Sequence, residues 1–352
     1  MNVCIVNPNF YRSSGVTIAV KRIHEAVSKH GIENYFVNCN SDALMQDISW
    51  MPDGRLLKFN LMTLNPFRLL RELFLFFTWV KINKIDVIHV HHRRLAVLFA
   101  MCKYFFDGKL LYSANLTYKF SLLFWLFSPV SVIAITKSVV DNVKITTRAR
   151  YIEEIGNPTA FPDVIPDNRF QADQRHAICV ARLDPVKGHK YLIEAWNLLA
   201  KKGFSYQLTL VGEGQLLDQL KNRVTELGLD SLVNFYGYTS DVLSLYEKSL
   251  FSILVSEVEG QGIVTIEAAA SGRASLLTDV DGSRDCLPPN RLLSNGVQFS
   301  DVEGLANAIE YWFANPTSVL DEGLIFFDFH KALNSFEAVG EKYAKAYRRL
   351  VK

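Results

Sequence analysis

The chain has 352 residues, of which 49% are hydrophobic and 21% are charged. This composition is typical of globular proteins and excludes disordered or fibrous chains. At roughly 100 to 200 residues per domain, the length predicts two domains. The formal net charge of +2 excludes a protein that coats nucleic acid, so no nucleic-acid partner is expected.

The charge is divided unevenly along the chain. Residues 1–160 hold 19 basic and 11 acidic side chains, whereas residues 161–352 hold 19 and 25. The first part is therefore suited to a negatively charged surface, and the second part is not.

The cysteines are five in number and widely scattered, and none forms a Cys-x-x-Cys pair. This pattern argues against a disulfide framework and against a zinc site, and it fits a reducing cytoplasm. The first residues lack the basic start and the small-residue cleavage site of a signal peptide. We therefore expect a cytoplasmic protein.

Short apolar runs that are typical of buried strands recur along the chain, and helical patterns separate most of them. This alternation predicts an α/β fold with parallel sheets. The helix 189–202 shows the pattern well, because apolar residues recur on one stripe and Gly203 ends it. The expected strands are 3–6, 35–37, 87–90, 110–112, 132–135, 177–180, 207–211, 233–236, 251–255 and 274–277.

Two apolar segments need separate interpretation. Residues 120–135 carry no charge, but Pro129 interrupts them and a spanning helix needs about 20 residues, so we expect a buried helix followed by a core strand. Residues 66–84 combine Leu, Phe and Trp with four flanking basic residues. They are expected either to lie on a membrane surface or to pack as an amphipathic helix on their own domain.

The segment 156–174 carries three prolines and no periodicity, which is typical of an interdomain linker. We therefore predict domains at 1–160 and 161–330, followed by a basic C-terminal helix within 331–352.

A strand, a glycine loop and a helix follow one another at 251–272, which is a phosphate-binding arrangement. The glycines at 260 and 262 allow the backbone to approach a ligand, and the amides of Gly262, Ile263 and Val264 favour an anion. Glu267 lies one turn deeper on the same helical face, where a carboxylate can accept hydrogen bonds from a ribose. Glu259 lies on the glycine loop itself, nearer the open end of the sheet. The alternative is a capped helix with two solvated glutamates.

The second cluster is ARLDPVKG at 181–188, directly after the strand 177–180. Arg182 and Lys187 lie where open α/β sheets bind their ligands, and two cations there suit a diphosphate. The alternative is a surface Arg and Lys, each paired with a nearby acid such as Asp184.

Together the two clusters resemble the retaining glycosyltransferases of family 4, which have the GT-B architecture of two Rossmann-like domains facing each other across a cleft. The resemblance implies that Arg182 and Lys187 hold the donor diphosphate. It also implies that Glu259 contacts the transferred sugar and that Glu267 contacts the ribose. LVGEGQ at 210–215 and NFYGYTSDV at 234–242 carry the resemblance further.

The first half is similar to the acceptor domain of this family. Residues 11–31 occupy the place of its double-glycine loop, so Gly15 is expected near the donor phosphates, although Ser14 replaces the first glycine. His89 and His91 are candidates for the acceptor site or for core or surface positions. Asn115 stands where many relatives have a histidine that touches the donor sugar.

The second half also departs from the family pattern. Gln261 stands where an aromatic residue is usual, and Asp281 stands where a loop normally has glycine. Both departures are expected to alter sugar preference rather than fold.

The resemblance implies retention of anomeric configuration, a UDP- or GDP-sugar donor, no required cofactor and no metal. The stretch from Asp279 to Asp281 is not expected to bind a metal. We expect a saccharide or lipid-linked acceptor in bacterial surface polysaccharide or lipopolysaccharide synthesis, with the protein on the inner face of the cytoplasmic membrane. Two alternatives are a nucleotide-sugar epimerase of the same architecture and an inactive scaffold.

Overall fold

The structure is a computed structural model that describes residues 1–10, 14–40, 50–52, 54–165, 173–289 and 297–352. The chain divides into two compact units. The first comprises Met1–Pro158 with Phe336–Lys352, and the second comprises Thr159–Ser335. Part of the predicted linker, 166–172, lies outside the described residues. Within the described ranges, every helix is too short or too polar to cross a membrane.

The first unit contains a seven-stranded parallel sheet with the order β3-β2-β1-β4-β5-β6-β7. Its strands are β1 (Asn2–Asn7), β2 (Glu33–Asn38), β3 (Leu56–Lys58), β4 (Val87–Val90), β5 (Lys109–Ala114), β6 (Ser131–Ala134) and β7 (Tyr151–Glu154). The sequence analysis missed β3 and β7. Both are edge strands without a buried residue, so neither carries the apolar run by which the other strands were predicted.

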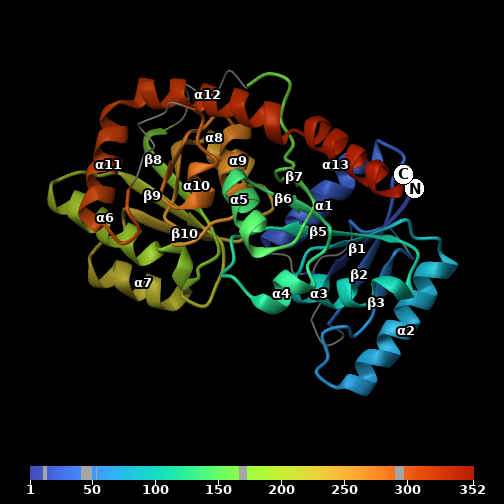
Figure 1. Ribbon diagram of the computed structural model, residues 1–352. Helices are drawn as coiled ribbons and strands as arrows, with labels where there is room; N and C mark the ends of the chain where they lie inside the picture. The colour runs from blue at the N-terminus through green and yellow to red at the C-terminus, as the bar shows by residue number, and fades with distance from the viewer. Residues whose placement is uncertain (11–13, 41–49, 53, 166–172, 290–296) are drawn as a thin grey trace. The chain divides into compact units, whose positions relative to one another are not determined.

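Helices cover both faces of this sheet (Figure 1). Because parallel crossovers are right-handed, the connection from β1 to β2 lies on one face and those leading from β3 to β7 lie on the other. The first face packs against α1 (Gly15–Ser28). The second packs against α2 (Pro66–Ile82), α3 (Arg93–Met101), α4 (Leu122–Leu126) and α5 (Lys137–Thr146).

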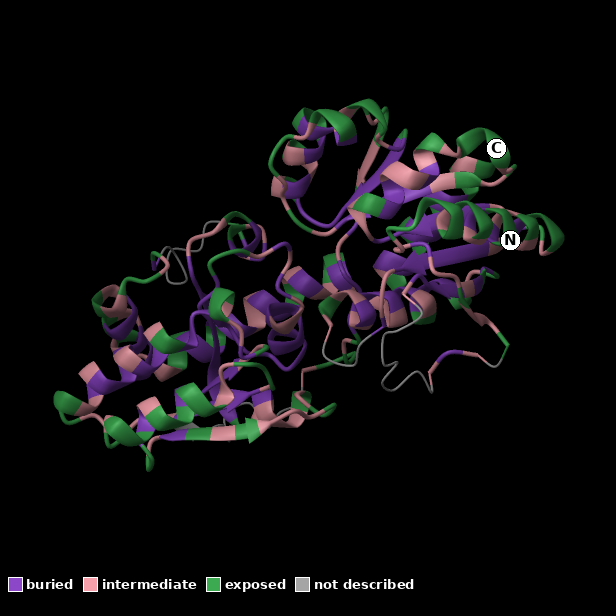
Figure 2. Ribbon diagram, turned by 90° about the horizontal axis from the view of Figure 1, so that it is seen from below, coloured by how far each residue is buried: buried purple, intermediate pink, exposed green. Residues whose placement is uncertain are grey.

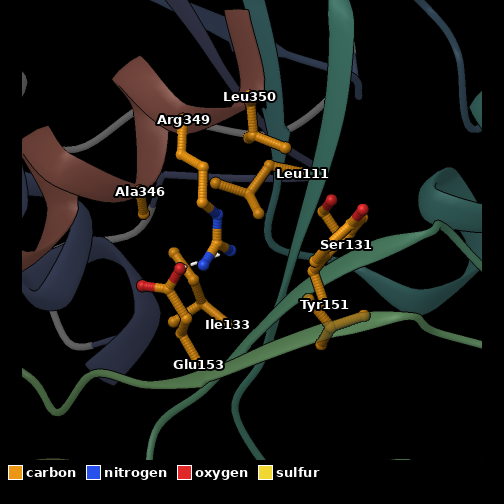
Figure 3. Close-up of a pocket in the computed structure, with 9 residues that line it drawn as sticks. Leu111, Ser131, Ile133, Tyr151, Glu153, Ala346, Arg349 and Leu350 are labelled. Carbon is orange, nitrogen blue, oxygen red and sulfur yellow. Dashed lines mark ion pairs between the residues drawn. The ribbon is translucent and has the colours of Figure 1, made fainter. Parts of the chain in front are cut away.

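The final helix, α13 (Phe336–Val351), belongs to the first unit and joins α1 in the core of the first face. The two helices approach closely, since a Cβ on Gly340 would lie 2.5 Å from the carbonyl oxygen of Ala26. Near its end, Arg349 forms an ion pair with Glu153. Figure 3 shows this pair inside a small pocket between α13 and the strands β5 to β7. The pocket has room for roughly one water molecule, so it is no ligand site.

The structure corrects the prediction for residues 120–135. The strand β6 is in the core as expected, but the helix α4 has five residues and only Phe124 is buried. Helix α2 is amphipathic, with Leu73, Phe76 and Val80 packed on its own domain. Its other face is exposed.

The second unit contains a five-stranded parallel sheet with the order β10-β9-β8-β11-β12. Figure 2 shows buried strands inside each unit and exposed outer helix faces. The strands are β8 (Asp173–Val180), β9 (Gln207–Val211), β10 (Val233–Gly237), β11 (Ser249–Leu254) and β12 (Ser275–Leu277). The helices are α6 (His189–Lys201), α7 (Leu217–Glu226), α8 (Leu243–Glu247), α9 (Ile263–Ala270), α10 (Asp281–Arg284), α11 (Val302–Ala314) and α12 (Pro316–Asn334).

The predicted helix after β8 is confirmed. In α6 the apolar stripe is buried, including Trp196, whose indole N–H donates to the carbonyl oxygen of Tyr206 at 3.0 Å. The described residues also include the short 3-10 helices η1 (Lys103–Phe105) in the first unit and η3 (Pro185–Lys187) in the second.

Candidate functional site

Two loops of the second unit meet beyond the ends of β8 and β11, which are neighbouring parallel strands. Their carboxyl ends share one edge of the sheet, so the segments that follow them lie side by side. The amide of Glu257 in the second loop donates a 2.9 Å hydrogen bond to the carbonyl oxygen of Val186 in the first. The two sequence clusters therefore belong to one site, as the carboxyl edge of an open α/β sheet predicts.

Gly188 is the point where these loops approach most tightly. Its φ is +64°, which disfavours residues with a side chain, and a Cβ there would lie 2.1 Å from the carbonyl oxygen of Val255. Glycine is therefore required at this position for two reasons: the backbone has a positive φ, and Val255 leaves no room for a Cβ. It ends η3 and begins α6, and so fixes the position of Lys187.

Lys187 and Glu259 form an ion pair within the site. Their side chains are only 19% and 10% exposed. The hydroxyl of Ser256 donates a 2.8 Å hydrogen bond to the same carboxylate oxygen of Glu259. Ser256 is itself held, because its carbonyl oxygen accepts a 2.6 Å bond from the hydroxyl of Thr278.

The sequence analysis did not single out Ser256. The available signal was its position, just after a buried strand and three residues before a glutamate of the motif. A residue that only orients another side chain belongs to no recognisable motif, so a single sequence does not reveal it.

The glycine loop leads into α9 as predicted. Gly262 precedes the helix and gives no side-chain cap, so the amides of Ile263 and Val264 are not capped by the side chain at that position. Such amides favour an anion. The amide of Gly262 itself forms a hydrogen bond with the buried thiol of Cys286. Glu267 lies one turn further along and is 6% exposed. The loop is supported from behind by Gly282, where a Cβ would lie 2.3 Å from the carbonyl oxygen of Glu259.

Arg182 lies at the rim of the site. Its side chain is 54% exposed and pairs with Asp184 at 2.7 Å, which is the pairing that the alternative interpretation proposed. A pair this exposed contributes little to stability, so the guanidinium is available to an incoming anion. Lys187 is also paired with an acid, Glu259, but it is not a surface side chain, because it is only 19% exposed.

The carboxylates of Asp279 and Asp281 are both engaged by Arg284. This guanidinium lowers the pKa of Asp279, mainly through a hydrogen bond. In the described ranges, no three His, Cys, Asp or Glu side chains gather in a way that could hold a metal ion. Arg284 thus holds both aspartates at the start of α10.

The predicted residues of the first unit lie at the carboxyl edge of its own sheet. Gly15 begins α1 and is exposed, and Ser14 before it gives no side-chain cap. His91 follows β4, and the half-buried Asn115 follows β5. Since β1, β4 and β5 are adjacent and parallel, these residues share one edge.

His89 lies in the core, which is one of the positions that the sequence left open for it. It is fully buried in β4. Its Nδ1 lies 2.8 Å from the hydroxyl of Tyr347, and its Nε2 lies 2.7 Å from the hydroxyl of Ser113. Both ring nitrogens are occupied, and the imidazole joins α13 to two strands of the sheet. Burial and the neighbouring His91 hold its pKa well below the usual range.

His91 is different. It is 6% exposed, and no protein partner among the described residues satisfies either ring nitrogen. Burial lowers its pKa to about 3, so it is neutral at pH 7. A buried imidazole with two unsatisfied nitrogens is unusual, which keeps His91 as a candidate for ligand contact.

The geometry of the second unit agrees with a comparison of protein families. Residues 161–322 match the family model described as glycosyl transferases group 1. Over most of its length, the second unit is therefore similar to a group 1 glycosyl transferase domain. It includes every residue of the site built around Lys187 and Glu259.

Individual relatives are named as glycosyltransferases. An uncharacterized glycosyltransferase of Haemophilus influenzae is 36% identical over 122 residues, covering 34% of each chain. A Campylobacter jejuni enzyme, named as an N-acetylgalactosaminyltransferase acting on a saccharide linked to PP-undecaprenol, is 34% identical over 114 residues. That match covers 32% of this chain and 31% of the enzyme. The chain thus spans about a third of the length of these two relatives.

The fold of the whole chain resembles that of HepE from Anabaena, solved in complex with UDP and glucose. The TM-score is 0.81 at 16% identity, and the match covers 99% of each chain. The predicted class of two Rossmann-like α/β domains with GT-B relatives is therefore confirmed.

Proposed function

We propose that the protein is a glycosyltransferase that moves a sugar from a nucleotide-sugar donor to a saccharide or lipid-linked acceptor. The observation that carries this proposal is the contact between Lys187 and Glu259 at the mouth of the α9 glycine loop. A cation for the diphosphate and a carboxylate for the sugar lie side by side there. We propose that Glu267, one turn into α9, binds the ribose.

Glycosyl transfer builds positive charge at the anomeric carbon and negative charge on the departing diphosphate. Arg182, Lys187 and the first amides of α9 supply fixed positive charge and dipoles for the leaving group. The reaction is proposed to need no metal or other cofactor. Activity that survives a chelator would support this, and activity restored only by an added divalent cation would oppose it.

Retention of anomeric configuration is part of the proposal. In the site, Glu259 is held by Lys187 and Ser256, and its carboxylate faces the leaving-group cation. The resemblance to the retaining glycosyltransferases of family 4 supports retention, and we propose attack from the same face as the departing phosphate, which acts as the base. Proton NMR of the fresh product, compared with the donor, measures the anomeric configuration directly.

The donor is proposed to be a UDP- or GDP-sugar, and UDP is supported by the complex in which HepE was solved. The lipid-linked acceptor named for the Campylobacter jejuni relative supports an acceptor of the same class. A step in bacterial surface polysaccharide or lipopolysaccharide synthesis fits both. The protein is proposed to work at the cytoplasmic side of the membrane.

Transfer is tested by incubating the purified protein with single nucleotide sugars and an undecaprenyl diphosphate-linked saccharide pool, then measuring the mass of the acceptor. An increase by one sugar residue, absent in Glu259→Gln, is the expected result. Release of a new epimer without acceptor would instead show the epimerase. No turnover of any donor, although nucleotide binds, would favour a binding protein.

A further inference from the structure

One face of the first unit is unusually apolar. Of the 26 large hydrophobic side chains that are exposed in the described part of the chain, 17 lie between residues 64 and 145. That segment holds α2, α3, α4 and α5, which cover the same side of the sheet, and the short helix η1 that follows α3 (Figure 1). We call this surface the α2–α4 face.

Helix α2 contributes a continuous outer stripe. Leu73, Phe76 and Val80 turn inward, whereas Phe67, Leu70 and Phe74 are 83%, 65% and 71% exposed. The outward positions also include Arg71, Thr78, Lys81 and Ile82, and they recur every three to four residues. Apolar and basic side chains therefore share one exposed stripe.

The connections that follow carry more exposed apolar side chains. Around η1, the side chains of Met101, Tyr104 and Phe105 are 52%, 86% and 75% exposed. In α4, only Phe124 is buried. The exposed apolar residues in and beside this helix are Phe120, Leu122, Leu123, Leu126 and Phe127.

The charge of this part of the chain limits the kind of partner that can bind the α2–α4 face. Residues 64–150 hold 13 Lys and Arg against four Asp and Glu, a net charge of +9 in a protein whose total is +2. A second copy of the same face would bring two such charges together, which opposes self-association. An anionic lipid surface complements the charge and accepts the apolar side chains.

We propose that the α2–α4 face docks on an anionic lipid bilayer, with the exposed side chains of α2, η1 and α4 inserted among the headgroups. The amphipathic helix lies in the plane of the interface, and its Arg and Lys side chains contact lipid phosphates. This proposal rests on the first unit alone and is independent of the donor site. It would hold an enzyme that uses a lipid-linked acceptor at the surface where the acceptor resides.

The test is co-sedimentation of the full chain with mixed phosphatidylglycerol–phosphatidylcholine vesicles and with pure phosphatidylcholine vesicles. Wild type is expected to bind the anionic vesicles and to be released as salt rises. Phe67→Ala/Phe74→Ala and Leu122→Ala/Leu126→Ala are each expected to weaken binding roughly tenfold or more. These side chains are exposed, so folding should be retained.

Matched controls come from the second unit. Tyr236→Ala/Tyr311→Ala removes two aromatic side chains that are each 51% exposed, and it should leave vesicle binding unchanged. Arg71→Gln/Lys81→Gln should reduce binding to anionic vesicles, whereas Lys201→Gln/Lys221→Gln, which changes two exposed lysines of the second unit, should have a much smaller effect.

Equal binding to both kinds of vesicle, or wild-type binding by the α2 and α4 variants, would overturn the proposal. The proposal would also be overturned if wild type does not bind vesicles but forms a dimer in sedimentation analysis, and if the same variants dissociate that dimer. Nucleotide binding measured on the same samples separates the two claims. Vesicle binding without nucleotide binding would defeat the proposed function and leave the docking surface in place.

Discussion

The ammonium group of Lys187 contacts the carboxylate of Glu259 directly, and Ser256 donates to the same oxygen of that carboxylate at 2.8 Å. The family resemblance assigns Lys187 to the donor diphosphate and Glu259 to the transferred sugar. The structure adds that these groups are each other's partners. A diphosphate that binds Lys187 must therefore compete with Glu259, whereas an intact nucleotide sugar brings hydroxyl groups that can engage the released carboxylate.

Glu259→Gln should abolish transfer while increasing affinity for the nucleoside diphosphate. Removing the carboxylate frees Lys187 from a charge-assisted hydrogen bond, which corresponds to roughly tenfold tighter binding. Calorimetry with the diphosphate measures the affinity, and Glu257→Gln on the same loop is the control. Unchanged affinity in Glu259→Gln would mean that the ion pair does not restrain Lys187.

Ser256→Ala should lower kcat about tenfold and change KM little, because Ser256 acts on the orientation of Glu259 and not on the donor. The control is Ser275→Ala, which removes another buried hydroxyl, one that has no hydrogen-bond partner among the described residues. Steady-state kinetics of both variants measures the difference. If Ser275→Ala lost as much activity, loss of a buried hydroxyl and not positioning would explain the result.

Gly188→Ala should destabilise the second unit and weaken nucleotide binding. The positive φ costs about 1 to 2 kcal/mol for alanine, and the clash with Val255 adds roughly 1 to 3 kcal/mol. Gly228→Ala is a close control, since its φ is +68° and a Cβ there meets nothing within 4 Å. Urea unfolding followed by circular dichroism measures both. If both variants lost the same free energy of unfolding, the close approach of the loops at Gly188 would not explain the effect.

Burial lowers the pKa of His91 to about 3, whereas an unfolded histidine titrates near 6.5. Between these values the unfolded chain binds a proton that the folded chain does not. The stability that neutral His91 provides is therefore complete above pH 6.5 and is lost as the pH falls toward 3. From this residue alone we expect a loss of about 2 kcal/mol between pH 7.5 and pH 5.

The His91 prediction is tested with His91→Asn, which should unfold with a shallower dependence on pH over the same range. Urea unfolding of both proteins at several pH values gives the slopes. Parallel slopes for wild type and variant would show that His91 titrates normally.

The sequence predicted the parts of the fold that carry strong local patterns. Strands are present at all ten predicted positions, and their apolar runs are largely buried except in β10, where only Val233 is buried. Helix α6 begins at His189, as its stripe and flanking residues indicated. The edge strands β3 and β7 were missed because pairing at a sheet edge requires no apolar run. The expected buried helix after residue 120 is a short and largely exposed one, since an apolar composition does not reveal whether a surface is covered.

Within the candidate site, residue types and spacing indicated Arg182, Lys187, Glu259 and Glu267, and strand adjacency brings their loops together. The sequence did not predict which side chains these residues contact. Neither the ion pair of Lys187 with Glu259 nor the support from Ser256 follows from spacing, because each depends on how two loops pack. His89 was a candidate for the acceptor site because of its residue type and its place near a strand end. In the structure it is a hydrogen-bonding group of the core.

The central claim is that the second unit binds a nucleoside diphosphate between Lys187, Arg182 and the start of α9. Calorimetric titration of UDP, GDP and ADP into wild type and into Lys187→Ala and Arg182→Ala tests it most directly. We expect one nucleotide to bind to wild type, Lys187→Ala to lose most of the affinity, and Arg182→Ala to lose less, because the Arg182 side chain is exposed. If none of the three binds, or if Lys187→Ala binds as tightly as wild type, the donor site is not where the structure indicates.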